Sequence, residues 1–328
     1  MILPSFVYSA TDRCDMRCEY CPTEGQGSYG ENFEISVNPL PVKDVAWIAA
    51  VGGEFGLGTF RLTGGEPLLD INRTVDILQA VVDSGRYSNV RLNTNGSRLL
   101  EAIPRLREIA FDALKVSLDT LDPVLFQKLT KSKKFDTVIK GIQVAAAEHL
   151  PIELNAVLTT ETAPGMLNLA TWCQDQGIPL KILDVVGYSS QPADYTEQSK
   201  TSQLRLSQQL HERFGPPEIV QLSNSRGILM KRYGTRPYVL FKDCAEGTTF
   251  TTYCKGCPQF PCEEGIHHLS LSTDGHLRPC RIRNNIFWDV RPIIARRDED
   301  ALRRLLRFLL ETAYAGEFLA VSPLAIIA

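Results

Sequence analysis

Apolar and β-branched residues gather in short runs along the first half of the chain, and longer segments with helical spacing lie between these runs. The short runs predict strands, and the longer segments predict helices. Six strands are expected, at residues 4–9, 59–63, 90–94, 113–117, 152–158 and 180–185, with helices between them that include 42–55, 71–84, 135–148 and 165–176. This alternation predicts an α/β fold whose parallel sheet curls into a partial (β/α)6 TIM-like barrel, with the active site at the strand ends.

The alternation stops after Val186, where a polar segment at residues 187–203 predicts a loop or lid. We therefore expect a barrel domain at 1–190 and a smaller α+β domain at 191–328. The second region carries short strand-like pieces, five of the nine cysteines, and an Asp274-Gly275 turn that predicts a hairpin. Leucines at helical spacing in residues 298–314 predict an amphipathic helix that closes the chain.

Composition narrows the functional classes. The 328 residues are 44% hydrophobic, and 35 basic residues nearly balance 38 acidic ones. No basic stripe supports nucleic-acid binding, so a small or weakly charged substrate is the better expectation. The sequence has neither a recognisable cleavable signal nor an apolar stretch of membrane-spanning length, so we expect a cytoplasmic protein without a membrane partner. In a reducing compartment, nine cysteines favour metal ligation, catalysis or burial over disulfides.

Three cysteines lie directly after the first predicted strand. Cys14, Cys18 and Cys21 have C-x3-C-x2-C spacing, so their thiolates can converge on one metal centre. Zinc usually takes a fourth protein ligand, and no cysteine or histidine follows before Pro67. Three ligands leave one iron of a [4Fe-4S] cluster open, where a molecule with an amine and a carboxylate can bind. A zinc knuckle or simply buried thiols are the alternatives.

These residues and several later motifs resemble the radical S-adenosylmethionine superfamily, and within it the MoaA-like GTP 3',8-cyclases, over roughly the first 190 residues. The matching motifs are TDRC, RCEYC, LTGGEPLL at 62–69, TNGSRL, VSLDTLDP and FDTVIKGIQVAAA. The resemblance implies that a reduced cluster cleaves S-adenosylmethionine and that the 5'-deoxyadenosyl radical abstracts hydrogen from, or adds to, a substrate. It also implies a flavodoxin- or ferredoxin-type reductant as partner.

The resemblance assigns roles to residues at the predicted strand ends. Cys14, Cys18 and Cys21 would hold the cluster, and the Gly-Gly-Glu-Pro sequence would receive the methionine amino group of the cofactor. Glycines let a backbone approach a ligand, and a carboxylate can accept its hydrogen bonds. Each polar residue is also an ordinary cap or turn residue. The expected cofactor-binding residues are Tyr20, Gly64, Gly65, Glu66, Pro67, Thr94, Asn95, Ser117, Asp119 and Asn155.

The second cysteine group resembles the auxiliary-cluster module called a twitch domain, related to SPASM domains. Our preferred ligands for a second [4Fe-4S] cluster are Cys254, Cys257, Cys262 and Cys280. Cys244 is then a spare thiol that would ligate or donate a hydrogen atom to a substrate radical. Structural zinc is the alternative, because His267, His268 and His276 lie near the same cysteines. Cys173, on a predicted helix, is expected to be a buried hydrophobic residue.

Departures from the MoaA-like pattern bear on the substrate. HHLSLSTDG at 267–275 stands where those cyclases carry a nucleotide-reading arginine strand, and Glu153 stands where they place a lysine. We therefore expect another small molecule, such as a nucleoside, a sugar or a natural-product intermediate. The alternatives are the GTP 3',8-cyclase itself, with Arg281 and Arg283 replacing the missing arginines, a peptide-modifying enzyme, and a non-catalytic iron-sulfur or zinc scaffold.

Overall fold

A computed structural model describes residues 4–21, 39–185, 203–221, 229–241, 248–257, 260, 262, 268–280, 286–316 and 318–320. The first half contains the expected alternation of strands and helices. Its elements are β1 (Ser5–Ser9), α1 (Val42–Glu54), β2 (Thr59–Thr63), the 3-10 helix η1 (Pro67–Asp70), α2 (Ile71–Asp83), β3 (Asn89–Thr94), α3 (Leu99–Leu106), β4 (Ala113–Ser117), α4 (Pro123–Thr130), α5 (Phe135–Ala147), β5 (Ile152–Leu158), α6 (Ala163–Asp175) and β6 (Leu180–Asp184). All six predicted strands are confirmed to within one residue at each end.

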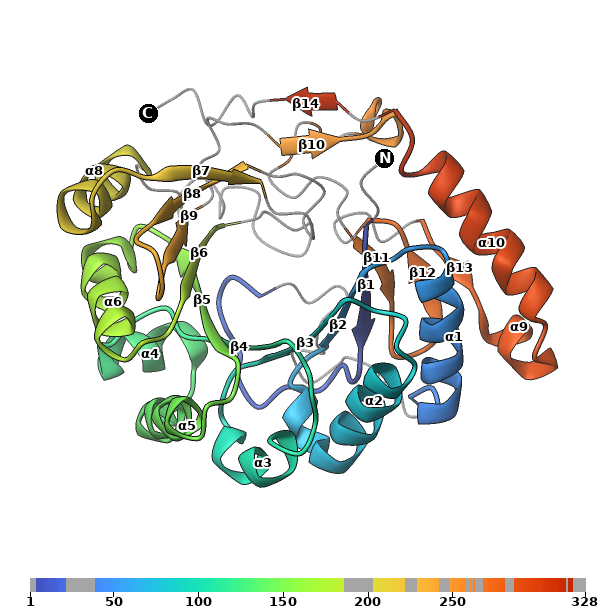
Figure 1. Ribbon diagram of the computed structural model, residues 1–328, viewed down its shortest axis with the longest axis horizontal. Helices are drawn as coiled ribbons and strands as arrows, with labels where there is room; N and C mark the ends of the chain where they lie inside the picture. Colours follow the sequence, from blue (N-terminus) through green and yellow to red (C-terminus); the bar gives the residue numbers. More distant parts are fainter. Residues whose placement is uncertain are drawn as a thin grey trace.

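The first six strands lie side by side in chain order, and all of them are parallel. Their carboxyl ends therefore meet at one edge of the sheet. The sheet is strongly curved, and helices α1 to α6 cover its outer, convex face (Figure 1). The fold is the expected α/β partial barrel, because β13 and β7, the two ends of the described sheet, are not paired with each other.

The alternation of residue types along the strands explains which side chains face the helices. In β3, Val90 and Leu92 are buried in the hydrophobic core, whereas Arg91 and Asn93 point to the opposite face. In β5, Leu154 and its alternate neighbours are buried in the same way. The hydrophobic core thus lies between the sheet and the outer helices, and the inner face of the sheet carries polar and charged side chains.

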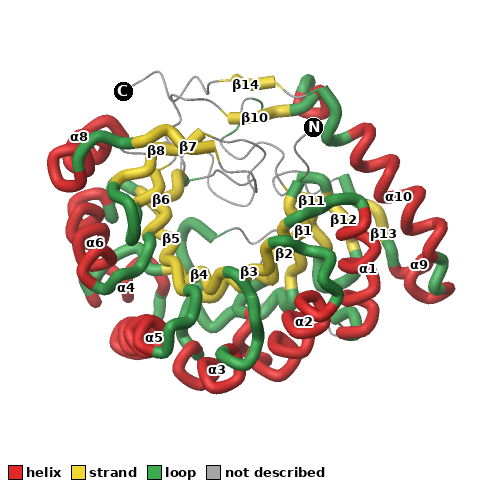
Figure 2. The backbone as a smooth tube through the Cα atoms, viewed as in Figure 1, coloured by secondary structure: helices red, strands yellow, loops and turns green. Residues whose placement is uncertain are grey.

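The second half of the chain extends the same sheet at both edges. Its elements are α8 (Gln203–Phe214), β7 (Glu218–Gln221), β8 (Leu229–Tyr233), β9 (Val239–Phe241), β10 (Thr248–Phe250), the 3-10 helix η4 (Thr252–Cys254), β11 (His268–Leu271), β12 (His276–Arg278), β13 (Trp288–Asp289), α9 (Arg291–Arg296), α10 (Glu299–Thr312) and β14 (Phe318–Ala320). Strand β9 runs parallel to β6, and β11 runs parallel to β1. Strands β10 and β14 form a separate pair on the open side of the curve (Figure 2). The expected boundary near residue 190 lies outside the described residues.

Two expected features of this half are confirmed. Strands β11 and β12 form an antiparallel hairpin, and Gly275 in its turn has a φ of 87°, which glycine adopts at little cost. The closing helix is α10, which buries leucines such as Leu302 and Leu306 and packs against α1. Arg297 at the start of this region pairs with Asp44 and lies over the Trp47 ring, 4.4 Å from its centre.

Within the described residues, no helix combines the length and apolar character needed to cross a membrane.

Candidate functional site

The segment that follows β1 carries the three clustered cysteines across the carboxyl ends of the neighbouring strands. Its backbone bonds first to the Gly-Gly-Glu sequence after β2: Gly65 N donates to Thr11 O at 2.6 Å, and Glu66 N donates to Arg13 O at 2.7 Å. Further along, Arg17 N donates to Thr130 O at 2.9 Å. The cysteines are therefore held on a segment that is fixed by backbone bonds at both ends.

Both glycines of the Gly-Gly-Glu-Pro sequence are required by this contact. Gly64 has a φ of 147°, and a Cβ there would lie 2.5 Å from Thr11 O. A Cβ on Gly65 would lie 2.1 Å from Arg13 O, well inside any real contact distance. We expected the glycines to admit a ligand, whereas their close neighbours are the backbone atoms that lead to the first cysteine. Pro67 starts η1, and its carbonyl accepts from Thr74 Oγ1 at 2.6 Å.

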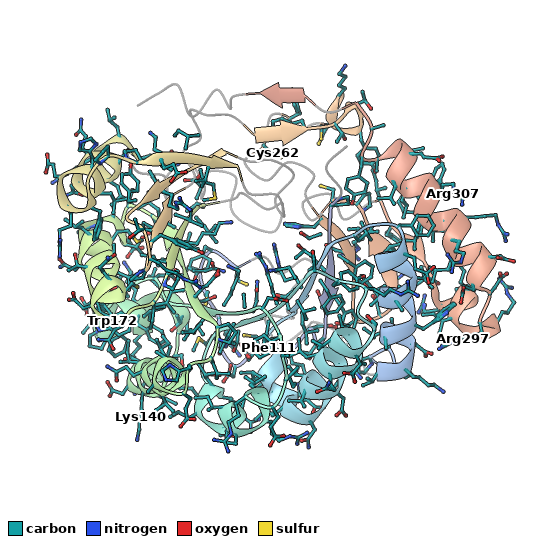
Figure 3. The ribbon with its side chains drawn as sticks, viewed as in Figure 1. Phe111, Lys140, Trp172, Cys262, Arg297 and Arg307 are labelled. Atoms are coloured by element: carbon teal, nitrogen blue, oxygen red, sulfur yellow. The ribbon has the colours of Figure 1, made fainter. Side chains whose placement is uncertain are left out.

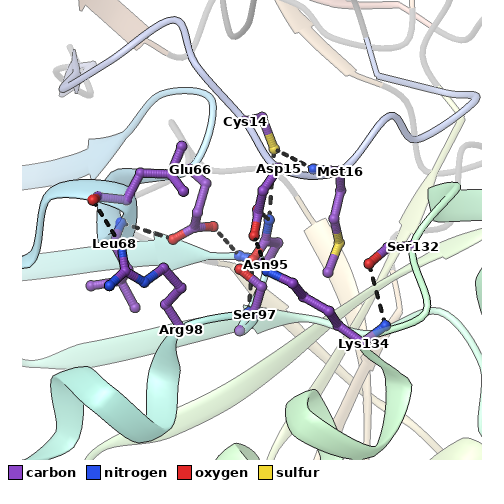
Figure 4. Close-up of polar contacts among 12 residues, drawn as sticks. Cys14, Asp15, Met16, Glu66, Leu68, Asn95, Ser97, Arg98, Ser132 and Lys134 are labelled. Atoms are coloured by element: carbon purple, nitrogen blue, oxygen red, sulfur yellow. Dashed lines mark hydrogen bonds and ion pairs between the residues drawn. The ribbon is translucent and has the colours of Figure 1, made fainter.

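Glu66 is completely buried, with none of its surface exposed. Its Oε1 accepts from Leu68 N at 2.9 Å and from Thr94 Oγ1 at 2.7 Å, while Oε2 accepts from Asn95 N at 2.6 Å (Figure 4). Burial raises the pKa of Glu66 to about 7, although these three hydrogen bonds favour the charged form. The expected carboxylate is therefore present at the strand ends, and it joins β2 to β3.

Asn95 lies directly beside the first cysteine. Its Nδ2 donates to Asp15 Oδ1 at 2.9 Å and approaches Cys14 Sγ at 3.6 Å (Figure 4). The other oxygen of Asp15 accepts from Lys134 Nζ at 2.7 Å. Burial would raise the pKa of Asp15, but its hydrogen bonds from Lys134 and Asn95 lower it overall, so this carboxylate is charged at neutral pH. The sequence analysis missed Asp15 and Lys134, although Asp15 follows the first cysteine directly.

Tyr20 and Asp119 contact each other rather than standing apart at the barrel mouth. The Tyr20 hydroxyl donates to Asp119 Oδ2, and Asp119 Oδ1 accepts from Val157 N at 2.7 Å. Asp119 is only 5% exposed, and burial raises its pKa to about 6. Both carboxylate oxygens therefore have protein donors. This contact joins the segment with the cysteines to β4 and β5.

The three thiols are the candidate ligands of an iron-sulfur cluster. All are partly exposed, and in the protein without metal, burial raises the pKa of Cys14 to about 11 and that of Cys18 well above its ordinary value. The charges of neighbouring thiolates raise both pKa values further. Within the described residues, no three potential ligands converge on a point suited to a single metal ion. A [4Fe-4S] cluster binds each thiolate at a separate iron, so three cysteines on one short segment suit it by their chemistry.

Ser117 and Asn155 are neighbours at the ends of β4 and β5. They are partners in the strand register, and Leu118 N donates to Asn155 O at 3.0 Å. The Ser117 side chain is exposed, whereas Asn155 Oδ1 is buried and has no hydrogen-bond partner among the described residues. A buried acceptor without a donor is costly, so Asn155 is suited to receive one from a ligand.

Charged side chains line the inner face of the sheet, and of these only Glu153 was singled out from the sequence. They are Arg61, Arg91, Lys115, Glu153 and Lys181, at inward-facing positions of β2 to β6. Lys115 Nζ pairs with Glu153 Oε2, and their side chains are only 7% and 27% exposed. The available signal was the alternation of these charges with apolar residues inside predicted strands, since one face of such a strand must be polar.

The second cysteine group is only partly described. Cys254 and Cys257 share one turn, in which Cys257 N donates to Cys254 O at 3.0 Å, and Cys280 is buried just after β12. Cys262 lies on the open side of the curved sheet (Figure 3). Cys244 and His267 lie outside the described residues. His276 Nδ1 contacts Asp274 Oδ2 at 2.8 Å across the hairpin turn. The second ligand set thus stays a prediction, while the expected burial of Cys173 is confirmed.

Comparison with known proteins places this site in a family. The family model described as "Radical SAM superfamily" matches residues 8–172, about half of the chain. A GTP 3',8-cyclase of Mesorhizobium japonicum is 34% identical over 58% of this chain and 57% of its own length. A GTP 3',8-cyclase of Rhizobium etli is 33% identical over 67% of this chain and 65% of its own length. A probable GTP 3',8-cyclase of Sulfolobus acidocaldarius is 28% identical over 87% and 83%. The chain spans between half and two thirds of the length of the first two relatives.

Solved structures support the fold. Streptococcus suis SuiB bound to S-adenosylmethionine is 17% identical, covers 93% of this chain and 68% of that chain, and has a TM-score of 0.62. The protein anSMEcpe with bound AdoMet is 15% identical, covers 85% of this chain and 72% of its own chain, and has a TM-score of 0.55. At these identities the likeness shows the shared architecture alone. Together with the family match and the cysteine-bearing segment, it shows that the chain belongs to the radical SAM superfamily.

Proposed function

We propose that the enzyme uses radical S-adenosylmethionine chemistry on a small molecule that carries an anionic group, such as a phosphate or a carboxylate, bound on the inner face of the curved sheet. When bound and reduced, the cluster on Cys14, Cys18 and Cys21 would supply an electron that splits S-adenosylmethionine into methionine and a 5'-deoxyadenosyl radical. The radical would take a hydrogen atom from the substrate or add to it.

The residues at the strand ends support the cofactor half of this proposal. Buried Glu66 offers a carboxylate near the segment with the cysteines, and Asn155 offers a buried acceptor at the end of β5. Ser117 lies between them on β4 with its hydroxyl exposed. These groups suit the amine, carboxylate and ribose hydroxyls of S-adenosylmethionine, because each of these groups needs a fixed hydrogen-bond partner.

The inward-facing charges support the substrate half, and they are the observation on which it mainly depends. Arg61, Arg91, Lys115 and Lys181 are four cations, while Glu153 is the carboxylate that faces them from the same strands. Burial lowers the pKa of Lys115, and the charges of Arg91 and Arg61 lower it further. Such crowded cations are stabilised by an anionic ligand. The even charge of the whole chain, which suggested a weakly charged substrate, does not describe this face.

A second candidate is the GTP 3',8-cyclase reaction. The names of the relatives at 33% and 34% identity favour it, and a nucleoside triphosphate would match the inward-facing cations. Against it stands Glu153, a carboxylate at the position where the MoaA-like pattern has a lysine, as the sequence analysis noted. Arg281 and Arg283, which would take part in nucleotide reading, lie outside the described residues.

We further propose that the second cysteine group holds an auxiliary [4Fe-4S] cluster. The turn shared by Cys254 and Cys257 and the burial of Cys280 just after β12 support this proposal. Cys262 would complete the set, and Cys244 is the spare thiol. A zinc ion in this group would make it a structural site.

The proposal is tested by anaerobic reconstitution, metal counting and a dithionite-driven assay for 5'-deoxyadenosine. The assay is run on the wild type and on a Cys14/Cys18/Cys21→Ala variant, with GTP, with other phosphorylated small molecules, and with their dephosphorylated forms. We expect about eight irons per chain, loss of about four in the variant, and 5'-deoxyadenosine formation stimulated by phosphorylated compounds only. Equal stimulation by dephosphorylated compounds would refute the anionic substrate. Stimulation by GTP with a cyclised product would establish the cyclase.

A further inference from the structure

We propose that Asn95 tunes the reduction potential of the cluster at Cys14, by donating a hydrogen bond from its side-chain amide to the cysteine sulfur. The inference depends on the superfamily membership of the chain and on the contacts around Cys14. It does not depend on the identity of the substrate.

The orientation of the Asn95 amide is fixed by its neighbours. Ser97 N donates to Asn95 Oδ1 at 2.8 Å, so this atom is the oxygen and the other side-chain atom is the NH2 group. The NH2 group has two hydrogens. One serves Asp15 Oδ1 at 2.9 Å, and the other is free to point to Cys14 Sγ at 3.6 Å (Figure 4). The main-chain nitrogen of Asn95 is in turn held by Glu66.

Cys14 lies in surroundings where such a donor has a large effect. Cys14 is only partly exposed, and the carboxylates of Glu66 and Asp15, which both accept hydrogen bonds from Asn95, place negative charge near its sulfur. The compensating donors are the amide of Asn95 and Met16 N, which lies 3.5 Å from the sulfur. Reduction adds a negative charge to the cluster, and hydrogen bonds to its sulfurs stabilise that charge. Asn95 should therefore make the cluster easier to reduce.

The same contacts separate Asn95 from a residue that only supports the fold. Asp15 is held from its other side by Lys134 Nζ at 2.7 Å, so the segment keeps an anchor when the Asn95 amide is removed. Backbone bonds from Gly65 and Glu66 hold the segment independently of any side chain. Loss of the amide should thus change the electrostatics at Cys14 more than the position of the cysteine.

The test is an anaerobic redox titration of the reconstituted protein, followed by electron paramagnetic resonance. At a fixed potential near the wild-type midpoint, we expect Asn95→Ala to lower the ratio of reduced to oxidised cluster about tenfold, which for a one-electron couple is a shift of about 59 mV to lower potential. Asn95→Asp keeps the acceptor for Ser97 N but replaces the amide with a carboxylate, so it should lower the ratio further. Asn72→Ala is the matched control, because exposed Asn72 accepts from Arg105 Nη1 at 3.0 Å between the outer helices α2 and α3.

Unchanged ratios in both Asn95 variants, with four irons retained at this site, would overturn the proposal. So would loss of the cluster from both variants while circular dichroism shows them folded, since a tuning residue is not needed for assembly. A decrease in Asn95→Ala and a larger one in Asn95→Asp, with Asn72→Ala equal to wild type, would establish it. These outcomes are read without substrate, so they stand apart from the proposed function.

Discussion

Glu153 on β5 and Lys115 on β4 are register partners that form an ion pair on the inner face of the sheet. Lys115 is the more deeply buried, and burial lowers its pKa despite the attraction of Glu153. Burial acts to raise the pKa of Glu153, but the charges of Lys115, Arg91 and Lys181 lower it overall. The pKa of Glu153 is lowered by Lys115, Arg91 and Lys181 together, so Glu153 is a shared counter-ion for several cations.

Replacement of this counter-ion should destabilise the free protein. In Glu153→Gln, Lys115 and Arg91 face each other without a carboxylate, and we expect the free energy of unfolding to fall by about 2–3 kcal/mol, less than for a completely buried pair because Glu153 is partly exposed. Glu161→Gln is the control, since its pair with Lys128 is exposed and should contribute less than about 1 kcal/mol. Urea unfolding gives both values. Equal losses in the two variants would show that the inner pair has no special weight.

The same variant bears on anion binding. In the wild type, the Glu153 carboxylate competes with an added anion for the inward-facing cations. Without it, pyrophosphate should bind more tightly, so it should raise the melting temperature of Glu153→Gln more than that of the wild type. Lys115→Met should show a smaller rise than the wild type. A thermal shift series over pyrophosphate concentration checks both expectations, and an identical response of all three proteins would argue against an anion site on this face.

The close contact at Gly65 predicts a second effect. Gly65→Ala places a methyl group 2.1 Å from Arg13 O, so the segment that carries the cysteines must move. We expect a loss of about 1–3 kcal/mol in stability and a clear fall in iron content after reconstitution. Gly165→Ala, in helix α6, is the matched control, because a Cβ there meets nothing within 4 Å and alanine favours a helix. Normal iron content in Gly65→Ala would show that the contact does not position the cysteines.

The sequence predicted the strands well because each one combines an apolar run with an alternation set by burial on the helix side. The sequence analysis missed helix α4, although the Asp-Pro pair at 122–123 is a typical helix start. Asp122 accepts from Val124 N at 2.8 Å, and Pro123 lies in the first turn. Helix α3 was hidden by Pro104, which lies inside it. Helix α6 begins before the expected residue 165, because Pro164 fits the first turn, where its missing N–H is not needed.

The sequence predicted which residues belong to the site, but it could not predict which of them contact one another. Lys115 and Glu153 are 38 positions apart, and their pairing follows only from the register of β4 and β5. The glycines at 64 and 65 were expected to let the backbone approach a ligand. The atoms that come closest to them are instead backbone atoms of Thr11 and Arg13. Long-range packing decides such neighbours, and a local pattern contains no information about it.

Stability of the metal-free protein should depend on pH through Glu66. Its pKa is about 7 in the folded protein against 4.5 as the ordinary value, so the folded state binds the proton more tightly. The stability from this group is therefore present in full below about pH 4.5 and is lost as the pH rises through about 7, with a total of roughly 3 kcal/mol. Urea unfolding at pH 5 and pH 8 should show a smaller difference for Glu66→Gln than for wild type. The idea fails if both proteins show the same difference.

The contact between Tyr20 and Asp119 predicts an effect that separates positioning from simple stability. Tyr20→Phe removes the donor to Asp119 Oδ2 and leaves that buried oxygen without its partner, which should cost about 1–3 kcal/mol. Tyr87→Phe is the matched control, since the Tyr87 hydroxyl donates to Ala49 O at 2.6 Å on the helix side of the sheet. The two variants should lose similar stability in urea unfolding. Only Tyr20→Phe should weaken S-adenosylmethionine binding to the reconstituted protein, measured by equilibrium dialysis, because only its hydroxyl joins the segment with the cysteines to β4 and β5. Equal binding by both variants would mean that Asp119 supports the barrel without positioning the cofactor.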